Sequence, residues 1–348
     1  MSLLQLRDVA VTYRTASGEV PAVRGVSLDL AAGQALGVAG ESGSGKSTLA
    51  MALLRLLPRD ARVTGEILLD GEDVLTMKWG RLRAVRWASA SVVFQGAQHA
   101  LNPVRRIEDQ IAEPLLVHGL ATPAAARRKV GELLEQVGLP AWRARGYPHE
   151  LSGGQRQRVM IAMALACSPR LIIADEPTTA LDVMIQAQVL ALIRSLIAEH
   201  GISLIMISHD LSVLAAMCDR LAVMYAGRVV ESGPAHEVSR DARHPYGRAL
   251  AEAFPTVGDP ASRLAPRGLG GDPPDPRNLP AGCSFHPRCP VSLPMCATRE
   301  VELWPVGGGR TEEGLPASHA AACVHVLPEG ARAEGPDVPV AHSTEGVA

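Results

Sequence analysis

The octapeptide 40-GESGSGKS-47 follows the apolar run Gln34 to Ala39 and precedes a helix-like segment, Thr48 to Leu57. Its spacing is G-x-x-x-x-G-K-[ST], and a strand before it and a helix after it are the setting in which that spacing binds phosphate. Glycines let backbone N–H groups curl around phosphate oxygens, and the helix N-terminus adds the positive end of its dipole. We therefore expect Lys46 to reach the terminal phosphates of a nucleotide and Ser47 to ligate Mg²⁺. The predicted nucleotide-binding residues of this segment are Gly40, Ser42, Gly43, Ser44, Gly45, Lys46, Ser47 and Thr48.

A second segment, Leu171 to Glu176, is a strand-like apolar run that ends in two carboxylates. An acidic pair after a strand is by itself usually a solvated loop. Together with the octapeptide, it predicts that Asp175 holds Mg²⁺ through water and that Glu176 polarises the attacking water as general base.

A third segment, Leu151 to Gln155, precedes another helix-like stretch. Ser152 and Gln155 have the S-x-x-Q spacing of a capping box, which could simply mark a well-capped helix. The alternative is a second anion site, because Gly153 and Gly154 leave the backbone bare at a helix N-terminus.

The chain divides by pattern into three parts, predicted at residues 1–240, 241–327 and 328–348. The first alternates strand-like and helix-like segments, as an α/β fold with a parallel sheet does. Its N-terminal strands, Leu3 to Tyr13 and Thr64 to Asp70, predict a smaller antiparallel piece with a turn at Asp70-Gly71. Pro and Gly crowd the linker-like residues 255–280, and the last part is polar and predicted to be disordered. Further predicted strands are Leu171 to Ala174 and Ser203 to Ile207, and further predicted helices are Ala124 to Val137, Gln155 to Cys167 and Val183 to His200.

Bulk composition narrows the classes of function. Hydrophobic residues make up 47% of the 348 residues, enough for a sizeable core, and the net charge of −2 includes no long basic run. Nucleic acid is therefore not the expected partner. The apolar run Val159 to Cys167 is shorter than the roughly 20 residues that a membrane-spanning helix needs. Without a secretory pattern, an intracellular protein with reduced cysteines is predicted.

Residues 3–240 strongly resemble the ATP-binding cassette (ABC) family, because five motifs occur in the order of that family. The resemblance implies a P-loop nucleotide-binding domain with antiparallel β and α-helical subdomains. It also implies two cassettes that dimerise head to tail. The segment Ser152, Gly153, Gly154 and Gln155 of one would then face the ATP γ-phosphate held by Lys46 of the other.

The same resemblance implies roles for four more residues. Gln95 matches the Q-loop glutamine, a Mg²⁺ contact and relay to the membrane subunit, and Asp182 matches the D-loop that crosses the dimer. His209 matches the switch histidine at the γ-phosphate, and Tyr13 matches the aromatic that stacks on adenine. A lone histidine after a strand is more often a capped residue, and a lone tyrosine near the N-terminus is usually a packing residue.

The C-terminal part resembles the extension of the oligopeptide, dipeptide and nickel importer subfamily. The resemblance rests on His244-Pro245-Tyr246, Gly282 to Pro290, Cys296 and Ala320 to Cys323. It implies an ATP-hydrolysing subunit at the cytoplasmic face of the membrane that energises di- or oligopeptide uptake, with nickel or another solute as an alternative. The implied partners are a second cassette, for which the resemblance favours a paralogue, two transmembrane permease subunits and an extracytoplasmic substrate-binding protein. A soluble ABC ATPase is the less favoured alternative, because neither a long coiled-coil insertion nor a second cassette occurs in the chain.

Four of the six cysteines fall between Cys283 and Cys323, with the spacing C-x5-C-x6-C and then a gap of 26 residues. The surrounding segment is rich in Pro and poor in apolar residues, so an inorganic centre is a plausible stabiliser. Zinc usually takes at least one closer pair, which favours a 4Fe–4S cluster over zinc as the predicted group. Its ligands would be Cys283, Cys289, Cys296 and Cys323, whereas Cys167 and Cys218 are predicted to be core residues.

Overall fold

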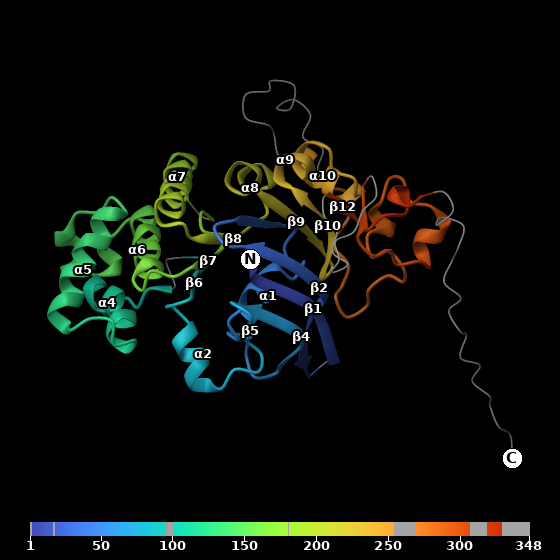
Figure 1. Cartoon of the computed structure of the whole chain (residues 1–348). Coiled ribbons are helices and arrows are strands. Elements are labelled where there is room, and N and C mark those ends of the chain that lie inside the picture. Colours follow the sequence, from blue (N-terminus) through green and yellow to red (C-terminus); the bar gives the residue numbers. More distant parts are fainter. Residues whose placement is uncertain are drawn as a thin grey trace, which may run out of the picture.

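The computed structural model describes residues 2–16, 18–94, 96, 100–179, 181–253, 269–306 and 319–328. Within them the chain forms two β-sheets with helices around them, as the predicted α/β class requires (Figure 1). A four-stranded antiparallel sheet has the order β2-β1-β4-β5, and its strands are β1 (Ser2–Thr15), β2 (Gly18–Ala31), β4 (Ala61–Leu69) and β5 (Glu72–Asp73). The predicted turn at Asp70-Gly71 joins β4 to β5, and both residues have positive φ, as such tight turns require.

The larger sheet has eight strands in the order β11-β12-β10-β9-β3-β8-β7-β6. The pairs from β6 through β7, β8 and β3 to β9 are parallel, and β10, β11 and β12 continue the sheet antiparallel. Its strands are β3 (Ala35–Ala39), β6 (Ala90–Val93), β7 (Leu171–Asp175), β8 (Ser203–Ser208), β9 (Arg220–Tyr225), β10 (Arg228–Pro234), β11 (Trp304–Pro305) and β12 (Ala320–Ala321).

The core lies on both faces of the larger sheet, because alternate residues of a strand point to opposite sides. In β3, Leu36 and Val38 join the cluster shared with the antiparallel sheet, whereas Ala35 and Ala39 join the cluster shared with the helices. The central strands therefore read as continuous apolar runs, which is how they were predicted.

The helices confirm most of the predicted segments, with one clear error. Helix α1 ends at Ala52, not at Leu57, because the chain turns at Arg55, whose φ is 50°. Leu53 and Leu54 are buried although they lie beyond the helix, so the apolar run continues past the last helical residue. The helices are α1 (Lys46–Ala52), α2 (Trp79–Val85), α4 (Ile107–Val117), α5 (Pro123–Gln136), α6 (Gly153–Leu165), α7 (Val183–His200), α8 (Leu211–Met217), α9 (Ala235–Arg240) and α10 (Pro245–Ala253).

One helix in the described part, α7, is long and apolar enough to cross a membrane by length and composition. Its Val189, Ile193 and Leu196 are buried in the core cluster with α6, whereas the rest of the helix, including Val183 and Met184, is half-buried or exposed.

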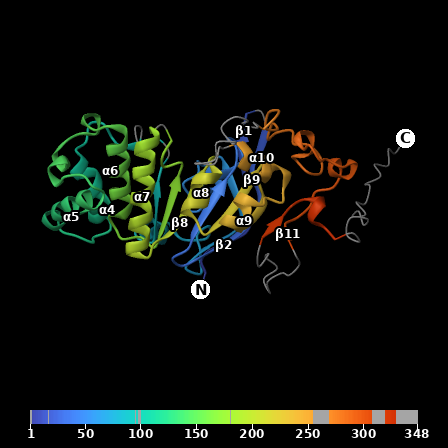
Figure 2. The same ribbon diagram turned by 90° about the horizontal axis from the view of Figure 1, so that it is seen from above.

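Three regions follow one another across the molecule. Helices α4, α5 and α6 lie together at one end, the sheets lie in the middle, and the segment after α10 lies at the other end (Figures 1 and 2). That last segment contains short 3₁₀ helices, η3 (His286–Arg288), η4 (Pro294–Ala297) and η5 (Val324–Val326), and its strand β12 pairs with β10. The remaining 3₁₀ helices, η1 (Ala141–Arg145) and η2 (Pro148–Glu150), belong to the helical end.

Candidate nucleotide site

The phosphate loop, residues 40–47, connects the end of β3 to α1. Gly40 has φ 152° and Gly45 has φ 100°, a range that favours glycine. A Cβ atom at Gly45 would lie 2.3 Å from the carbonyl oxygen of Ala22, and one at Gly40 would lie 2.3 Å from that of Met224. Glycine is therefore required at both positions by the neighbouring backbone as well as by φ.

Lys46 is folded into this loop and is only 5% exposed. Its Nζ donates to the carbonyl oxygens of Gly40 at 2.7 Å and Glu41 at 2.8 Å, and to Ser44 Oγ at 3.2 Å. Burial lowers the pKa of Lys46, and the carboxylates of Glu176, Asp175 and Glu41 act in the opposite direction. The loop thus holds a cationic donor at its centre, within reach of neighbouring acidic groups.

Ser47 and Asp175 meet at the carboxyl end of the sheet. Ser47 Oγ donates to Asp175 Oδ1 at 3.2 Å, although the two residues come from α1 and β7. Asp175 is 2% exposed; burial raises the pKa of its carboxyl, and the hydrogen bond from Ser47 acts against that rise. A hydroxyl and a carboxylate placed together supply the oxygen ligands that Mg²⁺ prefers.

Glu176 follows Asp175 with a positive φ of 44°, which turns the chain away from the strand. Its Oε2 accepts from Thr179 Oγ1 at 2.8 Å, and its Oε1 lies 3.6 Å from Nδ1 of His209. The His209 side chain is 54% exposed and that of Glu176 only 18%. A carboxylate directly after β7 and an imidazole directly after β8 therefore share one edge of the sheet.

Tyr13 lies beside the same helix, because its OH is 3.2 Å from Thr48 Oγ1. Two residues predicted to bind ATP, from β1 and α1, are thus joined by a hydrogen bond. Gln95, the predicted Q-loop residue, lies outside the described residues.

The signature segment, Ser152–Gln155, begins α6. Ser152 Oγ accepts from the Gln155 N–H at 3.3 Å, and Gln155 Oε1 accepts from the Ser152 N–H at 3.1 Å, so the predicted capping box is present. Asp182 caps the next helix, since its Oδ1 accepts from the Ile185 N–H at 3.0 Å.

The predicted residues therefore fall into two groups. Those of the phosphate loop lie near Asp175, Glu176 and His209, around α1 in the middle of the molecule. The signature segment belongs to α6, which lies with α4 and α5 at one end (Figure 1).

Two side chains that sequence reasoning missed are attached to the phosphate loop. Arg288 pairs with the Glu41 carboxylate, and Tyr246 OH accepts from the Glu41 N–H at 2.8 Å. Both residues lie in stretches that the sequence analysis used only for the subfamily resemblance. No local sequence pattern predicts that they contact Glu41, because more than 200 residues separate them from it.

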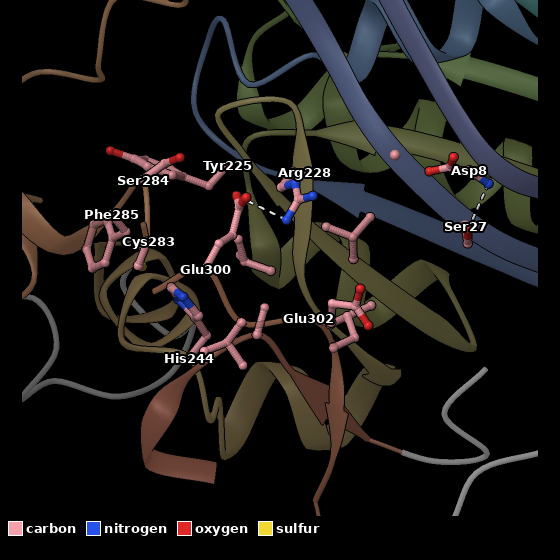
Figure 3. A pocket seen from close by; sticks show the side chains of 16 residues that line it. Asp8, Ser27, Tyr225, Arg228, His244, Cys283, Ser284, Phe285, Glu300 and Glu302 are labelled. Carbon is pink, nitrogen blue, oxygen red and sulfur yellow. Dashed lines mark hydrogen bonds and ion pairs between the residues drawn. The ribbon is translucent and has the colours of Figure 1, made fainter. Parts of the chain in front are cut away.

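A cavity of about 290 Å³, also unpredicted, lies between the last segment and the sheets and is lined by residues of both. Figure 3 shows Tyr225, His244, Cys283 and Phe285 on one side of it, and the ion pair between Arg228 and Glu300 across its middle. The Arg228 Nη1 to Glu300 Oε1 distance is 3.0 Å.

The six cysteines are free thiols in this structure. Burial raises the pKa of Cys167 to about 11 and that of Cys218 to about 12. Cys218 is buried, as predicted for a core residue, whereas Cys167 is only half-buried. Burial also raises the pKa of Cys323 to about 11, and the nearby thiols of Cys283, Cys289 and Cys296 add to that rise. Over the described residues, however, no group of three or more His, Cys, Asp or Glu side chains is arranged to hold a metal ion. The predicted iron–sulfur or zinc site is therefore without support from this arrangement.

Comparison with known proteins gives two matching family models. The ABC transporter model matches residues 23–179, and the model of the oligopeptide/dipeptide transporter C-terminal region matches residues 230–296. The chain is 43% identical to the oligopeptide transport ATP-binding protein OppD of Salmonella typhimurium, over 84% of this chain and 88% of that protein. It is also 43% identical to a putative peptide import ATP-binding protein of Brucella abortus, over 92% of this chain and 97% of that protein.

Solved structures give the same picture for the nucleotide-binding part. A dimeric ATP-binding cassette with bound ADP and phosphate, in a post-hydrolysis state, superimposes with a TM-score of 0.60 at 29% identity. It covers 67% of this chain and 98% of its own. A Clostridium perfringens protein that is part of an ABC transporter complex gives 0.59 at 28% identity, over 69% of this chain and 91% of its own.

Proposed function

Because this chain belongs to the ATP-binding subunits of ABC transporters of the oligopeptide importer type, we propose that it hydrolyses ATP to energise the uptake of di- and oligopeptides. The observation that carries the proposal is the convergence of Lys46, Ser47, Asp175, Glu176 and His209 at one edge of the sheet. A phosphate cradle, a hydroxyl–carboxylate pair and a positioned base are the parts that phosphoryl transfer to water needs.

Each of these side chains has a distinct role in the proposal. Lys46 leaves its loop carbonyls and binds the β- and γ-phosphates of ATP, and Tyr13 stacks on the adenine. Glu176, held by Thr179, accepts a proton from the attacking water. His209 contacts the γ-phosphate from its exposed position beside Glu176.

Ser47 and Asp175 fit a magnesium ion, because their oxygens lie 3.2 Å apart at the loop and both are ligand types that Mg²⁺ binds. Gln95 completes this proposed set. The ion would neutralise charge that develops on the phosphates. Asp175 would bind in its ionised form, which the hydrogen bond from Ser47 favours.

A second cassette completes the proposed site. The signature segment is held by its capping box at the start of α6, away from the phosphate loop of its own chain (Figure 1). In the proposed head-to-tail dimer its helix N-terminus faces the γ-phosphate held by the partner cassette, and Asp182 lies at the crossing. The further proposed partners are two permease subunits and an extracytoplasmic binding protein, which place the chain at the cytoplasmic face of the membrane.

Uptake measurements test the substrate class. Cells that lack this chain should lose uptake of labelled dipeptides and pentapeptides, and wild-type protein should restore it whereas Lys46→Ala should not. Loss of nickel uptake alone would favour the nickel alternative. Unchanged uptake of all of these solutes, with ATPase activity in the purified protein, would favour a soluble ABC ATPase.

We retain the 4Fe–4S cluster, with zinc as alternative, as a separate proposal for the four C-terminal cysteines. The Cys283 N–H donates to the Cys296 carbonyl oxygen at 2.9 Å, which brings two of the four residues together and supports the proposal. Over the described residues, however, their side chains are not arranged to hold a metal ion. Iron, sulfide and zinc analysis of anaerobically purified protein tests it, with Cys167→Ser as control for Cys283→Ser. Metal-free, folded protein would refute both forms.

A further inference from the structure

We propose that Arg288 is a positioning residue for ATP binding, because its guanidinium holds and neutralises the Glu41 carboxylate inside the phosphate loop. The inference rests on the proposed function and deepens it. It makes the affinity for nucleotide depend on the C-terminal segment that carries Arg288.

The contact between the two side chains is a two-point ion pair. Arg288 Nη1 lies 2.7 Å from Glu41 Oε2, and Arg288 Nη2 lies 3.0 Å from Glu41 Oε1. The arginine side chain is 7% exposed and the glutamate side chain 25%. A bidentate pair with little exposure is more strongly held than a surface ion pair, because water screens it less.

Glu41 is placed where its charge affects phosphate. Its carbonyl oxygen accepts from Lys46 Nζ at 2.8 Å, and its carboxylate acts to raise the pKa of Lys46. An uncompensated carboxylate at this position would repel the phosphates of ATP. Arg288 removes that repulsion, and its two contacts fix the direction of the Glu41 side chain.

Arg288 is itself held in place by its surroundings. Its Nε donates to the Gly270 carbonyl oxygen at 2.9 Å and its Nη1 to Tyr225 OH at 3.3 Å. The guanidinium carbon lies 5.9 Å from the Tyr225 ring and 6.0 Å from the Phe285 ring, within the range of cation–π contacts. Figure 3 shows Tyr225 and Phe285 side by side where the last segment meets the sheets.

The aromatic group also includes Tyr246, the residue that accepts from the Glu41 N–H. Tyr246 and Phe285 ring centroids are 5.4 Å apart, and those of Tyr225 and Tyr246 are 4.6 Å apart. Both the backbone and the side chain of Glu41 are thus tied to residues beyond β9. The phosphate loop is held from this side as well as by its own helix.

A second attachment of the same segment offers a matched control. Glu300 Oε1 lies 3.1 Å from Arg24 Nη2 and 3.0 Å from Arg228 Nη1, and neither arginine belongs to the phosphate loop. Arg277 pairs with Asp275 at 2.8 Å on the surface and supplies an exposed arginine for comparison.

Titration of the full-length protein with a fluorescent ATP analogue and Mg²⁺ tests the proposal. We expect Arg288→Met to raise the dissociation constant about tenfold, because the uncompensated Glu41 carboxylate would then repel the phosphates of ATP. Arg288→Lys, which keeps the charge but not the two-point geometry, should fall between Arg288→Met and wild type. Arg277→Met and Glu300→Gln should stay within about twofold of wild type, because neither side chain pairs with a residue of the phosphate loop.

The decisive comparison is the double variant. If Arg288 acts by neutralising Glu41, then Glu41→Gln in the Arg288→Met background restores much of the lost affinity. Wild-type affinity in Arg288→Met, or an equal loss with and without Glu41→Gln, would overturn the proposal. Melting curves check that each variant folds. If Arg288→Met does not fold, Glu41→Gln is introduced in the Arg288→Lys background instead. The absence of a gain in affinity from Glu41→Gln in that background would then count against the proposal. Wild-type protein that binds the analogue no better than Lys46→Ala would instead refute the proposed function.

Discussion

At the residue scale, the positions of single side chains follow from what surrounds them. Glu176 is turned out of the sheet by its positive φ and is held by Thr179, so its carboxylate is fixed before any substrate arrives. As the proposed general base, a carboxylate held in this way would lose little orientation entropy in the reaction.

We expect Glu176→Gln to bind ATP with near-normal affinity and to lose hydrolysis by about 10²–10⁴-fold, because the phosphate loop stays intact while the base is removed. ATP titration and phosphate release measure the two effects separately. Glu199→Gln, an exposed change on α7, serves as control. Near-normal turnover in Glu176→Gln would reject Glu176 as the base.

His244 sets a pH dependence of stability. Burial lowers the pKa of His244 to about 3, and its Nδ1 accepts from the Tyr246 N–H at 3.1 Å, so the folded state holds a neutral ring. The unfolded chain has a histidine pKa of about 6.5 and binds a proton that the folded chain does not. The free energy of unfolding therefore falls as pH decreases from about 6.5 toward about 3, by roughly 2 kcal/mol at pH 5.

Denaturant unfolding of wild type and His244→Asn at neutral and at mildly acidic pH measures this effect. Asparagine keeps an acceptor for the Tyr246 N–H but does not titrate, so the variant should lose less stability on acidification. His236→Asn, with a 75% exposed side chain, should behave as wild type. Parallel losses in wild type and His244→Asn would contradict the assignment.

At the scale of elements, α6 and α7 pack at the signature segment. A Cβ atom at Gly154 would lie 2.4 Å from Ile185 Cγ2, whereas one at Gly153 would lie 3.4 Å from Leu181 Cδ2. Carbon atoms in contact are normally about 3.5–4.0 Å apart. The packing of the two helices therefore requires glycine at position 154, whereas it leaves room for a Cβ atom at position 153.

We expect Gly154→Ala to destabilise the protein by about 1–3 kcal/mol, the usual cost of overpacking. Gly153→Ala should be close to neutral. Urea unfolding of the two variants measures the difference. Ile185→Ala should cost less in the Gly154→Ala background than in wild type, because it removes the methyl group that collides; equal costs would exclude this collision as the cause.

At the scale of the whole molecule, the two halves of the proposed ATP site lie apart in one chain. The signature segment belongs to the helical end, and the phosphate loop lies in the middle (Figure 1). The opposite end is joined to the sheet by β12 and by Glu231, which is fully buried and lies 2.6 Å from His319 Nε2. Because the signature segment and the phosphate loop lie apart, a single chain provides one copy of each half of the proposed site.

The isolated chain should therefore show weak ATPase activity, and a complex of two cassettes with two permease subunits should show strong activity. Phosphate release by the lone chain and by the complex purified from membranes, compared per cassette, measures this. Identification of the co-purifying proteins distinguishes a paralogous second cassette from a second copy. A fully active monomer would contradict the composite site.

Much of the fold could be predicted because its signals are local. Buried parallel strands read as apolar runs, and Gly201 ends α7 with a left-handed φ of 62°. The end of α1 was mispredicted, because Leu53 and Leu54 continue the apolar pattern beyond the helix. The strands β11 and β12 were also missed, since two-residue strands carry no periodicity.

The amino-acid sequence by itself determined the phosphate loop, the capping box at Ser152 and the strand that ends in Asp175 and Glu176. In each, the chemistry needs particular residues at short, fixed spacings. Only the tertiary structure decided that Arg288 meets Glu41, 247 residues away, and that Gly154 faces Ile185. Such pairs depend on how distant segments pack, and a contact made by chain folding leaves no spacing in the sequence from which it could be predicted.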